Sequence, residues 1–179
     1  MSTWAARRFW TAAITVPVEG GFTVQLDARP VRTPLKAPLV LPTKELADAV
    51  AAEWDAQVGK VDPETMPFTR TANSAIDKVA PQLAEVGAML ASYGASDLLC
   101  YRAEGPDELV SRQASAWDPV LDWAAETLGA PLVTTVGVMH VDQPVDSLSA
   151  LHKLVGDQTP FQLSAFHDLV AISGSLILA

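Results

Sequence analysis

The chain has 179 residues, of which 49% are hydrophobic and 18% are charged, and its formal net charge at pH 7 is −9. This composition is typical of a globular protein with a real core, and it excludes a disordered chain. The acidic balance argues against a nucleic-acid binder, which needs clustered lysines and arginines, and the single Cys100 excludes an internal disulfide and a multi-cysteine metal site.

Charge is unevenly placed along the chain. Residues 1–42 hold five basic and two acidic side chains, a net charge of +3, whereas the rest holds seven basic and nineteen acidic ones, a net charge of −12. An acidic body keeps a protein soluble, and it also suits a basic protein partner.

Residues 10–41 predict a small sheet. Two β-rich runs flank Glu19, Gly20 and Gly21, and the apolar residues of the second run alternate, which predicts a hairpin with one buried face. Pro17 places the first strand at an edge. Residues 31–42 predict further short strands, each ended by a proline.

Thr43 predicts the N-cap of a helix over residues 44–58, which ends at Gly59. We expect Trp54 to anchor this helix on the sheet. Its apolar stripe at helical spacing consists of Leu46, Ala47, Val50, Trp54 and Val58.

Residues 69–80 predict a second helix, capped near Thr69 or Thr71. Asn73 and Asp77 are four residues apart, so they lie on one face of it.

From residue 81 onward helices dominate. The pattern predicts a helix with an apolar stripe from Leu83 to Tyr93, a long helix over 106–130 bent at Pro119, a lone strand over 131–141, and helices from about Asp146 and Thr159. The stripe of the long helix comprises Leu109, Val110, Ala114, Trp117, Leu121, Trp123 and Leu128. We therefore predict an α+β fold, with a β-rich N-terminal domain over 1–80 and a mainly helical C-terminal domain over 81–179.

Known catalytic signatures are missing from the sequence, which has no HExxH, nucleophile elbow, P-loop or GxGxxG. The three histidines are expected to be structural. Asp118 and Asp122 are four residues apart and are interpreted as a solvated helix face rather than a Mg²⁺ site. We expect no metal and no other cofactor. Arg70 with Asp77, and Arg102 with Glu104, could form ion pairs that position elements.

The five tryptophans stand out in a chain that is otherwise poor in aromatic residues. Trp117 and Trp123 are six residues apart and so lie on different faces of their helix. One could fill the core while the other is available at a surface, where tryptophan is favoured in binding hot spots; alternatively, all five fill the core.

No targeting or membrane segment is visible. The first ten residues, MSTWAARRFW, lack the apolar core of a secretory signal. The most apolar stretch, residues 169–179, is eleven residues long, well short of the ~20 that a membrane helix needs, so we expect a core helix there. Because this run shows no C-cap glycine or polar tail, we also expect the sequence to be truncated within a helix.

Three long blocks carry a resemblance to a known family: LDARPVRTPLKAPLVLPT, AAEWDAQVGKVDPETMPFTRTANSAIDKV and YGASDLLCYRAEGPDELVSRQASAWDPVLDWAAETLG. In this order they are similar to the ATP synthase assembly chaperones that bind the free alpha subunit of the catalytic head. The matching positions include Arg29, Pro30, Thr33, Glu53, Trp54, Met66, Pro67, Arg70, Asn73, Asp77, Asp97, Tyr101, Arg102, Gln113, Trp117, Pro119 and Trp123.

The resemblance implies a chaperone that covers the beta-facing interface of the alpha subunit and releases it to the beta subunit without ATP hydrolysis. It also implies no enzymatic activity, no cofactor, no nucleic acid and no membrane insertion. A one-client escort suits a monomer. Compared with the family it resembles, the sequence shows no mitochondrial transit extension and stops before the family's remaining C-terminal helices, so we expect a bacterial cytoplasmic member that is truncated at its C-terminus.

Seven residues are the candidates for partner binding or for the junction between the two domains: Trp54, Arg70, Asn73, Asp77, Arg102, Trp117 and Trp123. We expect the segment 66–79 to fix that junction and so hold a composite binding surface in shape. Replacing Trp54 or Arg70 with alanine should then lower the melting temperature more than the affinity of each folded molecule.

Two other classes of function stay open. One is a general protein-interaction module with a different client. The other is a metal-dependent enzyme with an acidic site in the helical half at Asp118 or Asp122, which would bind divalent metal tightly.

Overall fold

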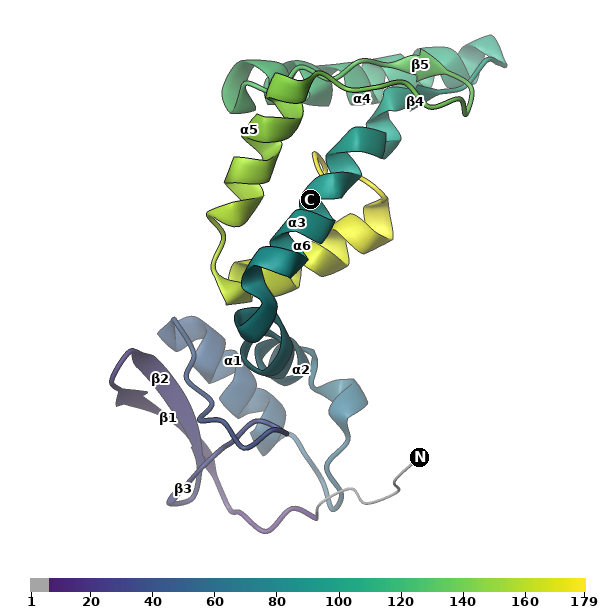
Figure 1. The fold of residues 1–179 in the computed structure, drawn as a ribbon. Helices are drawn as coiled ribbons and strands as arrows, with labels where there is room; N and C mark the ends of the chain where they lie inside the picture. Colours follow the sequence, from purple (N-terminus) through teal and green to yellow (C-terminus); the bar gives the residue numbers. More distant parts are fainter. Residues whose placement is uncertain (1–6) are drawn as a thin grey trace. The chain divides into compact units, whose positions relative to one another are not determined.

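A computed structural model describes residues 7–179, which divide into two compact units between Pro81 and Gln82 (Figure 1). Residues 1–6 lie outside the described residues. They include Trp4 and the first part of MSTWAARRFW, the segment in which we find no secretory signal. The first unit combines a small sheet with helices, and the second is mainly helical, so the predicted α+β class is confirmed.

The sheet of the first unit has three antiparallel strands in the order β1-β2-β3. They are β1 (Ala13–Val18), β2 (Gly21–Leu26) and β3 (Arg29–Pro30). The predicted hairpin is confirmed, and Pro17 lies in the edge strand, where its missing N–H costs no ladder bond.

The short strands predicted over residues 31–42 are wrong. This segment makes isolated bridges instead, Arg32 with Pro38 and Leu41 with Phe22, because its prolines cannot donate the hydrogen bonds that a ladder needs. Leu41 passes so close to β2 that a Cβ on Gly21 would lie 2.2 Å from the Leu41 carbonyl oxygen, so only glycine fits there.

Helix α1 (Lys44–Asp55) begins as predicted, since the Thr43 side chain accepts from the Leu46 amide at 3.2 Å. It packs on β1 and β2. Its predicted end at residue 58 is wrong, because the helix stops at Asp55 and Val58 is 89% exposed.

Buried Gln57 explains the early end of α1. Its side-chain amide donates to the Glu53 carbonyl and to Thr65 Oγ1, and its oxygen accepts from the Asp62 amide at 2.7 Å. These bonds hold the loop that follows, including the 3-10 turn η1 (Pro63–Thr65), and they need Gln57 outside the helix.

The second helical stretch starts at α2 (Pro67–Ser74), two residues before the predicted start, and its cap is neither Thr69 nor Thr71. It continues through the π-helical turn η2 (Ala75–Val79) and the 3-10 turn η3 (Ala80–Gln82).

The second unit contains four α-helices, two short strands and two 3-10 segments among its described residues. These are α3 (Leu83–Ala91), η4 (Ser92–Ser96), η5 (Leu98–Cys100), β4 (Tyr101–Arg102), α4 (Asp107–Leu128), β5 (Thr135–Val136), α5 (Val145–Gly156) and α6 (Pro160–Ser173). Helix α3 packs on α5 and α6. The core of the second unit includes Leu90, Leu99, Leu151, Val155, Leu163 and Val170.

Three expectations for this unit need correction. The lone strand over 131–141 is the two-residue β5, which pairs in parallel with β4. The long helix α4 has the predicted extent, but only Leu121 and Ala124 are buried in it, and Leu109 and Val110 are exposed.

The third correction concerns the C-terminal run. Helix α6 starts at the predicted Thr159 cap but ends at Ser173, with Gly174 at φ +69° as the C-cap. The expected absence of a cap glycine was therefore wrong, and residues 175–179 are not helical.

Candidate functional site

Glu53, beside the predicted site residue Trp54, caps helix α2 from a neighbouring helix. Its carboxylate accepts from the backbone amides of Phe68 and Thr69 at 2.7 and 2.8 Å, and from Thr69 Oγ1 at 2.7 Å. A carboxylate at a helix N-terminus satisfies free N–H groups and opposes the helix dipole favourably. Sequence analysis did not predict this capping role. The local signal was only the spacing of Glu53, which lies three residues after Val50 and so beside the apolar stripe of α1.

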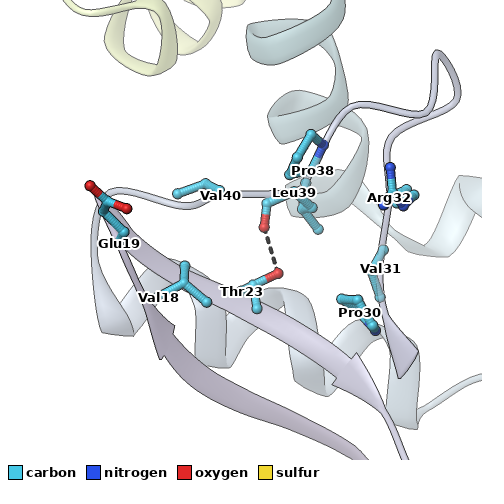
Figure 2. A pocket seen from close by; sticks show the side chains of 9 residues that line it. All are labelled: Val18, Glu19, Thr23, Pro30, Val31, Arg32, Pro38, Leu39 and Val40. Carbon is cyan, nitrogen blue, oxygen red and sulfur yellow. Dashed lines mark hydrogen bonds between the residues drawn. The ribbon is translucent and has the colours of Figure 1, made fainter. Parts of the chain in front are cut away.

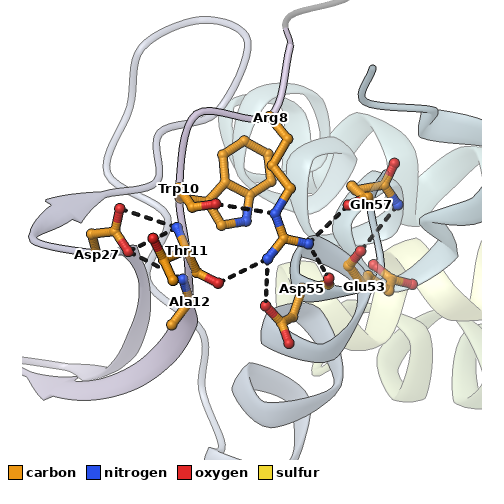
Figure 3. Close-up of polar contacts among 8 residues, drawn as sticks. All are labelled: Arg8, Trp10, Thr11, Ala12, Asp27, Glu53, Asp55 and Gln57. Atoms are coloured by element: carbon orange, nitrogen blue, oxygen red, sulfur yellow. Dashed lines mark hydrogen bonds and ion pairs between the residues drawn. The ribbon is translucent and has the colours of Figure 1, made fainter. Parts of the chain in front are cut away.

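Trp54 itself packs on Trp10, with ring centroids 5.4 Å apart in an edge-to-face arrangement. Figure 3 shows Arg8 beside Trp10, with its guanidinium between the segment 10–11 and the end of α1. Arg8 donates to the backbone oxygens of Trp10, Thr11, Asp55 and Gln57, and it forms an ion pair with the Asp55 carboxylate at 3.0 Å. Trp54 therefore anchors α1 on the segment that leads into β1.

Asp77 fixes the loop after β3. It accepts from Thr33 Oγ1 at 2.6 Å and from the Leu35 amide at 3.0 Å, and among residues 7–179 these are its partners in place of the expected Arg70. Arg70 is exposed on α2. Asn73 is half-buried, and its buried side-chain oxygen has no hydrogen-bond partner within the described chain.

In the second unit, Arg102 and Trp117 are brought together. The Arg102 guanidinium lies 5.4 Å from the Trp117 ring centroid, and it pairs with Asp118 at 2.7 Å rather than with the expected Glu104. Its Nε also donates to the Leu99 carbonyl at 2.8 Å. This cluster fastens β4 to the middle of α4, and it occupies Asp118 with a structural ion pair.

Trp123 lies further along α4 and is 48% exposed. It lines an apolar groove of about 250 Å³ with Leu128, Leu151, Leu154, Val155, Gln158, Phe166, Leu176, Ile177 and Ala179. Trp117 is thus covered by a cation while Trp123 faces a groove, so the two tryptophans do lie on different faces of α4.

A second apolar pocket of about 250 Å³ lies on the first unit, between β2 and the segment 38–40 (Figure 2). The Thr23 hydroxyl donates to the Leu39 carbonyl at 2.7 Å and holds that segment in place. Glu19 and Arg32 supply the charged groups of the lining, and none of the seven predicted residues lines this pocket.

Asp97, one of the positions that carry the family resemblance but not one of the seven candidate residues, is a fully buried carboxylate. It accepts from the Leu99 amide at 3.0 Å, and its second oxygen accepts from the hydroxyl of Ser175 and from the amides of Leu176 and Ile177, at 2.7–3.1 Å. Burial, with a smaller effect of the Asp97 charge, raises the pKa of the Cys100 thiol to about 11. The thiol is therefore neutral and unreactive at physiological pH.

The remaining polar groups form no recognisable reactive centre. Within residues 7–179, no three side chains from histidine, cysteine, aspartate or glutamate lie close enough to hold a metal ion. His140 contacts Tyr101 Oη and Asp142, and His167 contacts Asp168, all at exposed positions.

The described chain also contains no helix with both the length and the apolar character to cross a membrane.

Net charge separates between the two units. The first unit holds nine basic and nine acidic residues, and the second holds three basic and twelve acidic ones, so the whole −9 lies in the second unit.

Comparison with known proteins identifies the class more closely. Residues 7–125 match the sequence model of the ATP12 chaperone protein family. The crystal structure of Atp12 from Paracoccus denitrificans, and that of a point mutant of it, superpose with a TM-score of 0.94 at 54% identity, covering 97% of this chain and 74% of theirs. The Atu1473 protein of Agrobacterium tumefaciens superposes with a TM-score of 0.90 at 45% identity, covering 96% of this chain and 65% of its own.

The chain therefore belongs to the ATP12 chaperone family, and the resemblance read from the three sequence blocks is confirmed.

Proposed function

We propose that this protein is an assembly chaperone for ATP synthase that binds the unassembled alpha subunit of the catalytic head. The observation that carries the proposal is the similarity to Paracoccus Atp12, 54% identity over 97% of the chain, together with the family match. Both support a chaperone role in ATP synthase assembly.

The proposed task is to cover the surface through which the alpha subunit meets the beta subunit. An obligate interface exposes a large apolar area before assembly, and such a surface aggregates. The chaperone binds it in competition with the beta subunit, which then displaces the chaperone because the permanent interface is larger. No ATP hydrolysis is needed for such an exchange.

The chain acts by binding, as a monomer in the bacterial cytoplasm, without a cofactor and without catalysis. Support comes from the second unit, where Asp118 of the alternative acidic site is already paired with Arg102. Trp54, Asn73 and Asp77 serve the shape of the first unit, whereas exposed Arg70 and Trp123 are free to contact a client.

The test is light scattering of purified alpha subunit diluted from denaturant, with and without an equimolar amount of this chain. We expect scattering to be suppressed, and we expect added beta subunit to release the chaperone as a free monomer on gel filtration. Serum albumin at equal mass serves as the control. Aggregation that proceeds equally with this chain and with albumin would refute the proposal.

A further inference from the structure

The end of β5 and the bend that follows it present three apolar side chains to solvent. Val136 is 63% exposed, Val138 90% and Met139 76%. Single exposed apolar residues are common on protein surfaces, but three of them within four consecutive residues are not explained by the packing of the second unit. We call Val136, Val138 and Met139 the apolar tip.

The backbone on both sides of the apolar tip is held by hydrogen bonds. β5 pairs with β4, and the Gly137 amide donates to the Arg102 carbonyl at 2.8 Å. Beyond the turn, His140 Nδ1 lies 3.3 Å from Tyr101 Oη. Gly137 has φ +83°, a conformation that places the residues on either side of it in a tight turn.

The strands are held in turn by helix α4. Figure 1 shows β4 and β5 alongside α4. The Ala103 amide donates to Gln113 Oε1 at 2.8 Å, and Arg102 pairs with Asp118. The apolar tip is therefore presented on a braced support, and binding through it would cost little ordering entropy.

Two carboxylates, Glu104 and Asp142, lie near the two ends of the segment that carries the apolar tip. Glu104 Oε1 lies 3.0 Å from the position of a Cβ on Gly137, and Asp142 contacts His140 at 3.3 Å. The wider segment 101–145 is acidic as well, with seven carboxylates and two guanidinium groups, and one of each is taken up by the pair of Arg102 with Asp118. An apolar centre with an acidic border complements an apolar surface bordered by lysine or arginine.

We propose that the apolar tip is a client-contact site, and that it docks on an apolar patch bordered by basic side chains on the unassembled subunit. This inference rests on the proposed function and names the surface that performs it. Two valines supply apolar area, and the flexible Met139 adapts its thioether to an irregular client surface. Glu104 and Asp142 select the basic border and speed the encounter.

The first test replaces Val138 with aspartate and, separately, Met139 with glutamine. Because both side chains are exposed, the melting temperature should stay that of the wild type, while the affinity for purified alpha subunit should fall by about tenfold or more. Val58→Asp is the matched control, since Val58 is 89% exposed in the first unit. It should bind as the wild type does.

The second test replaces Glu104 and Asp142 together with lysine. The association rate should fall at low salt, and the difference from the wild type should shrink as salt is raised.

The outcomes separate the two proposals. If the wild type fails to bind the alpha subunit, the proposed function is wrong and this inference with it. If the wild type binds and both tip variants bind equally well, this inference alone is overturned. It is also overturned if the tip variants abolish a wild-type dimer on gel filtration and leave client affinity unchanged, because the tip would then serve self-association.

Discussion

At the scale of single residues, two carboxylates stabilise the fold through hydrogen bonds that the sequence pattern does not predict. Glu53 accepts from three donors at the start of α2, and Asp97 from four donors that belong to η5 and to residues 175–177. Both join segments that are distant along the chain. Each residue therefore stabilises a second segment of the chain in addition to the helix or turn in which it lies.

Replacing Glu53 with glutamine should destabilise the first unit by about 1–2 kcal/mol, because the amide keeps the shape but loses a charge that accepts from helix N–H groups. Urea unfolding followed by circular dichroism measures this. Glu126→Gln, at an exposed position of α4, is the control and should change stability by less than about 0.5 kcal/mol. Equal stabilities for the two variants would show that the charge of Glu53 contributes nothing to the cap.

Cys100 should resist thiol reagents until the protein unfolds. With the pKa raised to about 11 from an ordinary 9.0, the folded state holds its thiol proton more tightly than the unfolded state does. The corresponding stability is therefore complete below pH 9 and is lost as pH rises towards 11. Labelling with an alkylating reagent at pH 8 should be slow in buffer and fast in urea. Fast labelling of the folded chain would contradict the assigned burial of this residue.

At the scale of elements, helix boundaries set by local caps were predictable, and those set by distant partners were not. Thr43 and Thr159 cap their helices through bonds within three residues, so the local sequence is sufficient to place them. The end of α1 depends on Gln57 bonding a loop, and the start of α2 depends on Glu53 from another helix. Such partners are distant along the chain, so no pattern within one helix reveals them.

The candidate site shows the same division. The different faces of Trp117 and Trp123 follow from helical spacing, and the structure agrees. The expected ion pairs of Arg70 with Asp77 and of Arg102 with Glu104 were wrong. Proximity in the sequence suggested these pairs. In the structure, Asp77 instead accepts from the Thr33 hydroxyl, and Arg102 pairs with the Asp118 carboxylate on α4.

The segment after α6 should lose its place when Asp97 is replaced with asparagine. The amide can serve some of the four donors but brings its own N–H groups into a buried site, which leaves polar groups unpaired and costs about 1–3 kcal/mol. Hydrogen exchange of the Leu176 and Ile177 amides should speed up well before global unfolding. Amides of α1, in the other unit, are the internal control and should keep their protection.

At the scale of the whole molecule, the separation of charge is the main feature. The first unit is neutral, and the second carries the full net charge of −9. We propose that the two units are separate domains, as the division of the sequence near residue 80 predicts. Each would then respond to solution conditions in its own way.

Sodium chloride should stabilise the second unit and leave the first nearly unchanged. The second unit contains twelve carboxylates and only three basic groups. Screening of these charges by salt therefore reduces the repulsion between carboxylates more than it weakens the attraction within ion pairs. Raising salt from 20 to 300 mM should increase the melting temperature of that unit by about 3 °C. Hydrogen exchange of the wild-type chain as temperature rises, read by mass spectrometry on peptides of α5 and α6, would follow this unit separately from the first. A melting temperature that falls with salt would mean that the ion pair between Arg102 and Asp118 outweighs the collective repulsion.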